Sequence, residues 1–389
     1  MPEKHALLSA SSAKKWLNCP GSARLEAEFE DTTSEAAKEG THTHAIAELK
    51  LRKKFEVMST RTYNSRMKKL KEDPLYTQEM DHCTDTYLDF VTETAMSYPV
   101  VPTVEIEKQV DFSAYAPEGF GTADCIIIGG NTLNIVDYKH GKGVRVEAEN
   151  NPQMMLYALG ALPLYDWIYD IQTVRMSIVQ PRLDNISSFD IDAPALRAWG
   201  EETVKPTAQK AFDGVEEYCP GDWCTSGFCR ARATCRARCD QFGAIAEFKG
   251  VMPPRITNEE LGALLQKLQG AKKWIDELED YAAAELLVGH QVPGFKVVEG
   301  RSNRAFKDTD AAFQKIIAAG TPEAMLFERK PLPLSKIEGM LGKTTFAQLL
   351  QDEVVKPPGK PTLVPESDKR EPYRAACAAN EFEGVASDG

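Results

Sequence analysis

The chain has 389 residues, 42% of them hydrophobic, and a formal net charge of −12 at pH 7. This length allows two domains, or one large domain with an extension, and the hydrophobic content is enough for a core. The acidic charge argues against a uniformly basic nucleic-acid groove, although it leaves room for a local basic patch. We recognise neither a signal peptide nor a long apolar span, so we expect a cytoplasmic protein without a membrane partner.

The first 100 residues are predicted to be mostly helical, because apolar residues recur with a helical period in stretches such as 76–93. Cys19 lies on or just after an amphipathic segment. Further along, His44 and Glu48 share one face of a predicted helix because they are four residues apart. His42 is chemically an equally good candidate for a functional histidine, so the helical pattern leaves the choice open.

A β-hairpin is predicted from Gly121 to Lys139, where two short β-branched runs flank hairpin-turn residues. If the loop is Gly130-Asn131, Asp124 lies directly opposite Asp137, with their Cβ atoms about 4.5–5.5 Å apart. Alternate residues of a strand share a face, so Lys139 lies on the same side as Asp137. The hairpin therefore gathers two carboxylates and a lysine into one site.

This grouping predicts a site for a hard divalent cation. Opposed carboxylates repel unless a cation lies between them, and oxygen ligands suit Mg²⁺ or Mn²⁺. Such an ion acidifies water and stabilises charge on a phosphate, while Lys139 can hold the water or neutralise the phosphate. The pattern indicates metal-dependent phosphodiester cleavage. The alternative is an ordinary surface pair of Asp137 and Lys139.

A strand before the hairpin and a helix and strand after it complete the predicted order of helix, three strands, helix and strand. The preceding strand places Glu105 and Glu107 on one face, and we expect Glu107 to neighbour the site. The following helix carries Gln153 and Tyr157, which are either site residues or packing residues of an amphipathic helix. The last strand, VRMSIVQ, ends at Gln180.

Five cysteines crowd into one later segment, and we expect them to bind metal because disulfides are improbable in a cytoplasmic chain. They are Cys219, Cys224, Cys229, Cys235 and Cys239. Four closely spaced thiolates satisfy tetrahedral Zn²⁺, so a zinc knuckle is one hypothesis. Nearby basic residues form either a patch that follows phosphates or a solvated helix face. These are Lys14, Lys15, Arg230, Arg232, Arg236 and Arg238.

A helical extension is predicted beyond the boundary at Pro253-Pro254. Thr257 and Glu260 form a capping box before a leucine-rich stripe. The stripe is either a helical hairpin broken near Gly270 or one long helix. The predicted parts of the chain are a domain at 1–245, a helical extension at 255–350 and a proline-rich tail at 351–389.

These motifs together resemble the RecB-like branch of the PD-(D/E)XK nuclease superfamily, and more narrowly a phage-encoded group within it. The branch has a D-x-K hairpin, a following Q-x-x-x-Y helix and an upstream helical histidine. The resemblance covers about residues 7–240 and implies an α/β, restriction-endonuclease-like core with a mixed central sheet flanked by helices. The implied active centre is His44, Asp124, Asp137 and Lys139, with Gln153 and Tyr157 beside it. The implied ligands of the divalent ion are His44, Asp124 and Asp137.

The cysteines carry a second likeness within this branch. In nucleases such as the AddB subunit and the CRISPR adaptation nucleases, one N-terminal and three C-terminal cysteines hold a [4Fe–4S] cluster. By this likeness the ligands here are Cys19, Cys224, Cys229 and Cys235, and the cluster is structural. The sequence departs from the pattern in the wider gap between Cys224 and Cys229 and in two extra cysteines. Zinc therefore stays an alternative.

The resemblance implies a metal-dependent DNA nuclease of a phage, acting in the bacterial host cell, and an exonuclease of replication or recombination more than a sequence-specific endonuclease. Implied partners are DNA and, among phage proteins, a recombinase, a polymerase or a single-strand-binding protein. The alternative is an inactive or zinc-stabilised nucleic-acid-binding or interaction module of a phage replisome. The intact Asp124, Asp137 and Lys139 count against lost activity.

Overall fold

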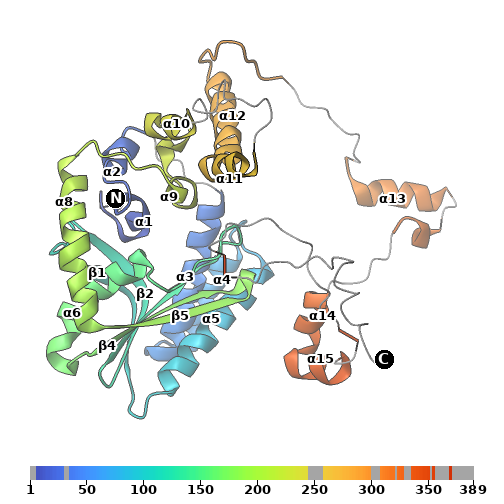
Figure 1. Cartoon of the computed structure of the whole chain (residues 1–389). Helices are drawn as coiled ribbons and strands as arrows, with labels where there is room; N and C mark the ends of the chain where they lie inside the picture. Colours follow the sequence, from blue (N-terminus) through green and yellow to red (C-terminus); the bar gives the residue numbers. More distant parts are fainter. Residues whose placement is uncertain are drawn as a thin grey trace, which may run out of the picture. The chain divides into compact units, whose positions relative to one another are not determined.

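The computed structural model describes most of the chain (Figure 1). The described residues are 6–29, 35–243, 257–298, 307–319, 322–327, 334–350, 353–354 and 368–369. By their contacts, the residues fall into two units, Met1–Val298 and Glu299–Gly389. None of the described helices combines the length and the apolar character that crossing a membrane requires.

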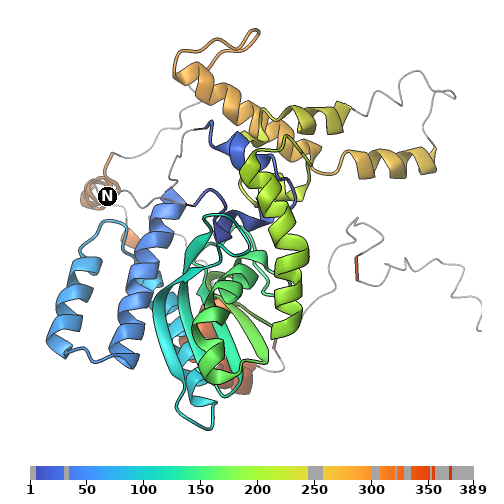
Figure 2. The ribbon, with the colours of Figure 1, turned by 90° about the vertical axis from the view of Figure 1, so that its left-hand side faces the viewer.

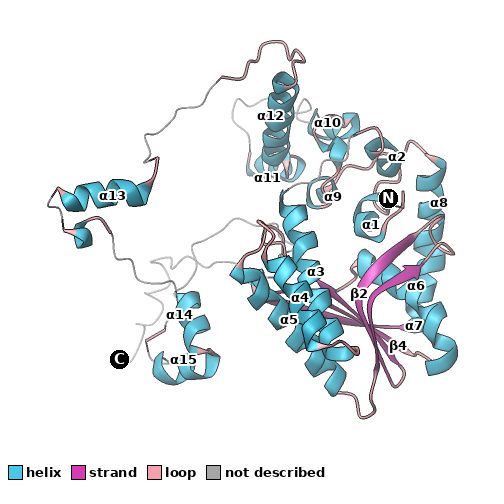
Figure 3. Cartoon of the chain, turned by 180° about the vertical axis from the view of Figure 1, so that it is seen from behind, coloured by secondary structure: helices cyan, strands magenta, loops and turns pink. Residues whose placement is uncertain are grey.

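A five-stranded sheet forms the centre of the first unit, with helices on both of its faces (Figure 3). The strands lie side by side in chain order, and among them the β3–β4 pair alone is parallel. They are β1 (Thr103–Asp111), β2 (Phe120–Gly129), β3 (Thr132–Tyr138), β4 (Thr173–Gln180) and β5 (Asn185–Asp192). The mixed sheet and its flanking helices confirm the predicted fold class.

The helix α6 (Pro152–Tyr169) makes the crossover that a parallel pair of strands requires, and it covers one face of the sheet. The side chain of Asn151 caps its start by accepting the backbone N–H groups of Gln153 and Met154. Pro152 occupies the first turn, where a missing N–H group costs nothing. The cap thereby fixes the turn that carries Gln153.

Two long helices, α3 (Glu35–Phe55) and α5 (Gln78–Met96), cover the opposite face of the sheet. Their apolar side chains form a second core with the strands, centred on Tyr87 and Tyr138. The helix α4 (Thr60–Lys71) packs beside α3 (Figure 2). Shorter helices complete this part: α1 (Ala13–Trp16), α2 (Ser22–Glu26), α7 (Ala193–Trp199), α8 (Lys205–Asp213), α9 (Asp222–Ser226) and α10 (Arg236–Gly243).

The predicted helical extension is present. The helix α11 (Asn258–Lys267) starts with the predicted capping box, in which Thr257 and Glu260 exchange side-chain to backbone hydrogen bonds. Gly270, with a φ of +86°, separates it from α12 (Ala271–Leu287), so the stripe forms two helices. The second unit contains α13 (Thr309–Ala318), α14 (Leu334–Leu341) and α15 (Lys343–Leu350).

The predicted domain boundaries, at 245–255 and 350–351, stay predictions. The division by contacts lies between Val298 and Glu299. The predicted proline-rich tail lies outside the described residues, except at 353–354 and 368–369.

Candidate functional site

The hairpin between β2 and β3 has the predicted register. Its ladder ends at the Cys125–Val136 pair and its loop is Gly130-Asn131, so the same register places Asp124 opposite Asp137. Beyond the last ladder pair, Asp124 Oδ2 accepts the backbone N–H of Tyr138 at 2.7 Å. The hairpin thus orients the Asp124 carboxylate through a backbone group of the partner strand.

Asp124 lies close to two other potential metal ligands, each from a different element. They are His44 on α3 and Glu107 on β1. Each of the three side chains offers one potential ligand atom, and these atoms lie within 4.8 Å of one another. The shortest measured approach is 3.5 Å, between His44 Nδ1 and Asp124 Oδ1. In the part of the chain that the structure describes, this is the one group of three or more histidine, cysteine or acidic side chains with that geometry.

His44 and Asp124 stabilise each other's charged forms. Burial favours the neutral imidazole, but the Asp124 carboxylate and then Asp137 raise the pKa of His44 to about 9. Burial also opposes ionisation of Asp124, while His44 and Lys139 bring the pKa of that carboxyl below its ordinary value. The pair therefore carries opposite charges near neutral pH.

Glu107 joins this group through a distortion of β1. Its φ is +49°, a left-handed conformation that costs a residue other than glycine about 1–2 kcal/mol. The β1–β2 ladder is paired at Ile106 and at Lys108 but skips Glu107, which would face Asp124. Burial and the nearby Asp124 raise the pKa of Glu107 to about 7. The expectation that Glu107 neighbours the site is confirmed.

Asp137 forms a second group with Lys139 and the start of α6. Lys139 Nζ lies 3.0 Å from Asp137 Oδ2 and donates to Gln153 Oε1 at 3.1 Å. Gln153 Nε2 in turn donates to Asp137 Oδ1 at 3.4 Å and to the Tyr157 hydroxyl at 3.3 Å. Burial opposes the charge of Lys139, but Asp137 and Asp124 raise the pKa of its ammonium. Burial raises the pKa of Asp137, with Lys139 opposing it.

The structure brings all six implied active-centre residues to one end of the hairpin. They are His44, Asp124, Asp137, Lys139, Gln153 and Tyr157. His42 is separate, because its side chain approaches Asp73 at 3.9 Å instead. The packing of α3 therefore distinguishes two histidines that the sequence pattern treats as equal.

A buried polar cluster beside the site had no signal in the sequence. His140 Nδ1 lies 2.9 Å from the Tyr138 hydroxyl, and His140 Nε2 lies 3.4 Å from Glu39. Glu39 also pairs with Arg182 at 3.2 Å. The Tyr138 ring meets the His44 ring edge-on, with centroids 5.4 Å apart. The cluster forms because the loop after β3 folds back against α3, which no local pattern predicts.

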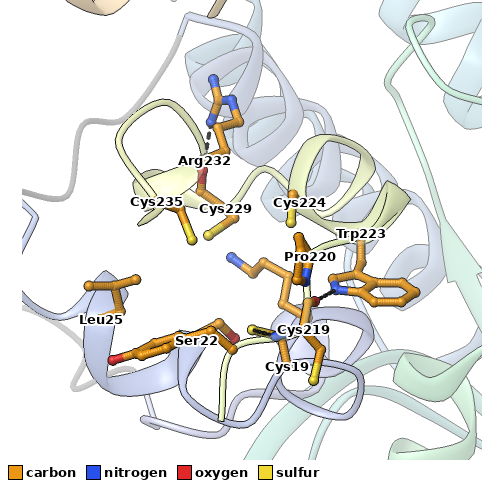
Figure 4. A pocket seen from close by; sticks show the side chains of 12 residues that line it. Cys19, Ser22, Leu25, Cys219, Pro220, Trp223, Cys224, Cys229, Arg232 and Cys235 are labelled. Atoms are coloured by element: carbon orange, nitrogen blue, oxygen red, sulfur yellow. Dashed lines mark hydrogen bonds between the residues drawn. The ribbon is translucent and has the colours of Figure 1, made fainter. Parts of the chain in front are cut away.

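Five cysteines from distant segments line one pocket: Cys19, Cys219, Cys224, Cys229 and Cys235 (Figure 4). Cys239 is exposed and does not line it. Two of the thiols accept backbone N–H groups, Cys19 Sγ from Cys219 at 3.3 Å and Cys224 Sγ from Gly221 at 3.5 Å. Such amide donors favour the thiolate form of a metal ligand.

The sulfur spacing bears on the two metal hypotheses. Tetrahedral Zn–S bonds of about 2.3 Å bring the ligand sulfurs within about 4 Å of one another. Among the described residues, no three cysteine sulfurs lie within 4.8 Å of one another. Burial raises the pKa of Cys19 and Cys224, and burial and then Glu26 raise the pKa of Cys229 to about 12.

The basic residues near the cysteines are largely engaged in ion pairs. Lys15 lies 2.7 Å from Glu26, and Lys14 lies 3.2 Å from Asp222. Arg232 lies 3.2 Å from Glu277 on α12, which also pairs with Arg238, 3% exposed. Lys14 therefore links the N-terminal helices to the cysteine segment, and Arg232 and Arg238 link that segment to α12.

The fold and the site define a mixed α/β protein with a partly buried centre of carboxylates, histidine and lysine. The chain belongs to a family described as "Protein of unknown function (DUF2800)", whose model matches residues 5–371. A solved structure titled "Crystal structure of SSO0001" is similar over 59% of this chain and 85% of its own, with 14% identity and a TM-score of 0.28. The assignment of the fold therefore rests on the strand order and register.

Proposed function

We propose that the protein is a metal-dependent DNA nuclease of the RecB-like PD-(D/E)XK type, an exonuclease of phage DNA replication or recombination. The observation that carries the proposal is the convergence of His44, Glu107 and Asp124 at the end of the hairpin that also presents Asp137 and Lys139. Three separate elements supply these groups, and one of them is distorted to do so. Backbone strain of this kind clusters at functional sites.

The residues present fit a divalent cation. His44, Asp124 and Asp137 are the implied ligands, and Glu107 adds a carboxylate that the family likeness did not supply. Oxygen ligands with one imidazole suit Mn²⁺, and the carboxylates alone suit Mg²⁺. A bound ion would supply Lewis-acid stabilisation of charge on the scissile phosphate and a lower pKa for the attacking water.

The chain's own groups would then position the substrate. Lys139 keeps its proton because two carboxylates raise the pKa of its ammonium, so it can neutralise a phosphate oxygen. Gln153 holds Lys139 by accepting its hydrogen bond, and it donates to Asp137 and Tyr157. The cap on α6 fixes Gln153 in place. This preorganisation is what charge stabilisation in a transition state requires.

Degradation of linear DNA in the presence of Mn²⁺ tests the proposal. Replacing Asp124 or Asp137 by Asn should lower the rate at least about 100-fold, because each carboxylate helps to hold the ion that stabilises the transition state. Glu105→Gln, on the same strand as Glu107 but outside the ligand group, should cleave like the unchanged protein. Full cleavage by Asp137→Asn, or cleavage that resists a chelator, would refute the assignment. Cleavage absent from every preparation would favour the inactive binding module.

We also propose that the cysteine pocket holds a [4Fe–4S] cluster through Cys19, Cys224, Cys229 and Cys235. The pocket supports it, because Cys19 and the three later cysteines line it together although they come from distant parts of the sequence. The amide donors to Cys19 and Cys224 support it as well. The cluster would be structural, since the pocket joins the N-terminal helices to the cysteine segment.

A further inference from the structure

The most basic part of this acidic chain is the end of α3 together with α4. Residues 52–71 contain eight basic side chains and a single acidic one, Glu56. The basic residues are Arg52, Lys53, Lys54, Arg61, Arg66, Lys68, Lys69 and Lys71. A segment with a formal charge of +7 in a chain of net charge −12 is a local basic patch of the kind that attracts polyanions.

The fold holds this charge on a fixed surface. On its inner side α4 packs Tyr63, Met67 and Leu70 into an apolar cluster with α3 and α5. The Ser59 hydroxyl caps the start of the helix by accepting the N–H of Thr62 at 3.1 Å. The apolar face is thus already covered by protein, so the helix has no face to insert into a lipid bilayer.

Three exposed cations on α4, Arg61, Arg66 and Lys69, have no acidic partner among the described residues. A favourable interaction with the helix dipole accounts for cations in the last turn, such as Lys69. It does not account for Arg61 in the first turn, where a cation is unfavourable by about 0.3–1 kcal/mol. Within the described residues these three charges have no acidic counterpart, so they are able to interact with a polyanion.

Two adjacent hollows, of about 270 and 480 Å³, run between α3 and α4. Both are lined by Glu48, Arg52 and Arg66, and we call them together the α3–α4 groove. Lys69 lines the first. The groove contains two carboxylates, Glu48 and Glu56, but each pairs with Arg52, at 2.7 and 2.5 Å. With Arg52, Arg66 and Lys69 against these two carboxylates, the residues that line the groove carry a formal charge of +1.

The groove lies next to the candidate active site along α3. Glu48 lies one turn along α3 from His44, and Arg52 Nη2 donates to the carbonyl of Ile106, the neighbour of Glu107, at 3.3 Å. His44 and Arg52 are eight positions apart, which corresponds to roughly 12 Å along the helix. That length corresponds to about three to four nucleotides of a strand in duplex geometry.

We propose that the α3–α4 groove binds the phosphate backbone of nucleic acid and leads it to the site at His44 and Asp124. Arg66 and Lys69 would contact phosphates, with Arg61 farther out on the same helix. Contacts of this kind position a strand without reading its sequence. The inference rests on the proposed nuclease function for the identity of the polyanion, and it adds where the strand lies.

Equilibrium binding of a fluorescent DNA oligonucleotide to the full chain, measured by anisotropy in Ca²⁺, tests this groove. The double variant Arg66→Glu with Lys69→Glu should bind at least about tenfold more weakly. The slope of its log affinity against log salt concentration should become shallower by the equivalent of about two phosphate contacts. The matched control is Lys272→Glu with Lys273→Glu on α12, which changes the net charge equally at exposed positions. The control should bind like the unchanged chain.

Equal binding by the two double variants would refute the proposal that the groove binds nucleic acid. Binding of the unchanged chain to anionic lipid vesicles but not to DNA would also refute it. The neutral pair Arg66→Gln with Lys69→Gln gives an intermediate loss and guards against misfolding of the charge-reversed variant. Because binding is read without cleavage, the outcome separates the two proposals. Groove-dependent binding without any Mn²⁺-dependent cleavage would refute the nuclease and leave the groove standing.

Discussion

His140 is a buried imidazole that faces charged and polar groups from four elements. These are Tyr138 from β3, Glu39 from α3, Arg182 after β4 and Glu79 from α5. Burial and then the Arg182 guanidinium lower the pKa of His140, and Glu39 offsets this in part. The imidazole therefore prefers to be neutral in the folded protein.

This preference predicts a pH-dependent contribution to stability. The unfolded chain takes up the proton near pH 6.5, the folded protein only at lower pH, so protonation favours unfolding as the pH falls below about 6.5. In urea unfolding, His140→Gln should gain stability relative to the unchanged protein as the pH falls from 7.5 to 5.5, because the contributions of His44 and Glu107 are common to both chains. An identical pH dependence in His140→Gln would contradict the prediction.

The residue-level composition of the site was only partly accessible from the sequence. Asp124, Asp137 and Lys139 follow from strand alternation and one turn, because hairpin register is a local property. The left-handed backbone conformation of Glu107 could not be predicted locally, since it depends on how β1 pairs with β2, the strand that carries Asp124. The choice of His44 over His42 likewise depends on which face of α3 meets the sheet.

At the scale of whole elements, one acidic residue of α12 forms ion pairs with the cysteine segment. Glu277 pairs with Arg232 and Arg238 and accepts a hydrogen bond from the Thr225 hydroxyl at 3.1 Å. One turn earlier, Trp274 stacks on Phe242 with ring centroids 5.0 Å apart. A predicted extension of the chain is thus part of the support of the cysteine pocket.

Glu277→Gln should destabilise this part of the protein by about 3–5 kcal/mol, because it leaves the buried Arg238 guanidinium without a carboxylate. Urea unfolding followed by tryptophan fluorescence measures the loss, since Trp274 lies on the same helix. Glu279→Gln, an exposed neighbour on α12, should cost less than about 0.5 kcal/mol. Similar stabilities for the two variants would show that the Glu277 pairs are dispensable.

The elements themselves were predictable where their signals are local. The three strands around the hairpin, the helix of Gln153 and the capping box at Thr257 all follow from short patterns. The partners of an element were not predictable in this way. Arg232 and Arg238 read as candidates for phosphate contact, yet their partner lies on α12, about 40 residues downstream.

At the scale of the molecule, the cysteine pocket connects the two ends of the folded region that contains the sheet. Cys19 belongs to the N-terminal helices, and the other cysteines of the pocket follow β5 and α8. A metal centre that joins Cys19 to these later cysteines would close a loop containing nearly the whole sheet domain. The free energy of metal binding then adds to that of folding, because the unfolded chain does not present the ligands together.

Metal content and stability should therefore change together. Anaerobically purified protein is expected to be brown and to contain about four irons per chain. Cys19→Ser should remove the colour and lower the melting temperature by on the order of 10 °C, since a single lost ligand opens the link between distant segments. Cys239→Ser, outside the pocket, should keep both. A colourless protein with one zinc ion that persists in Cys19→Ser would instead identify a local zinc site among the later cysteines. A melting temperature unchanged by Cys19→Ser would show that the metal link between Cys19 and the later cysteines has no structural role.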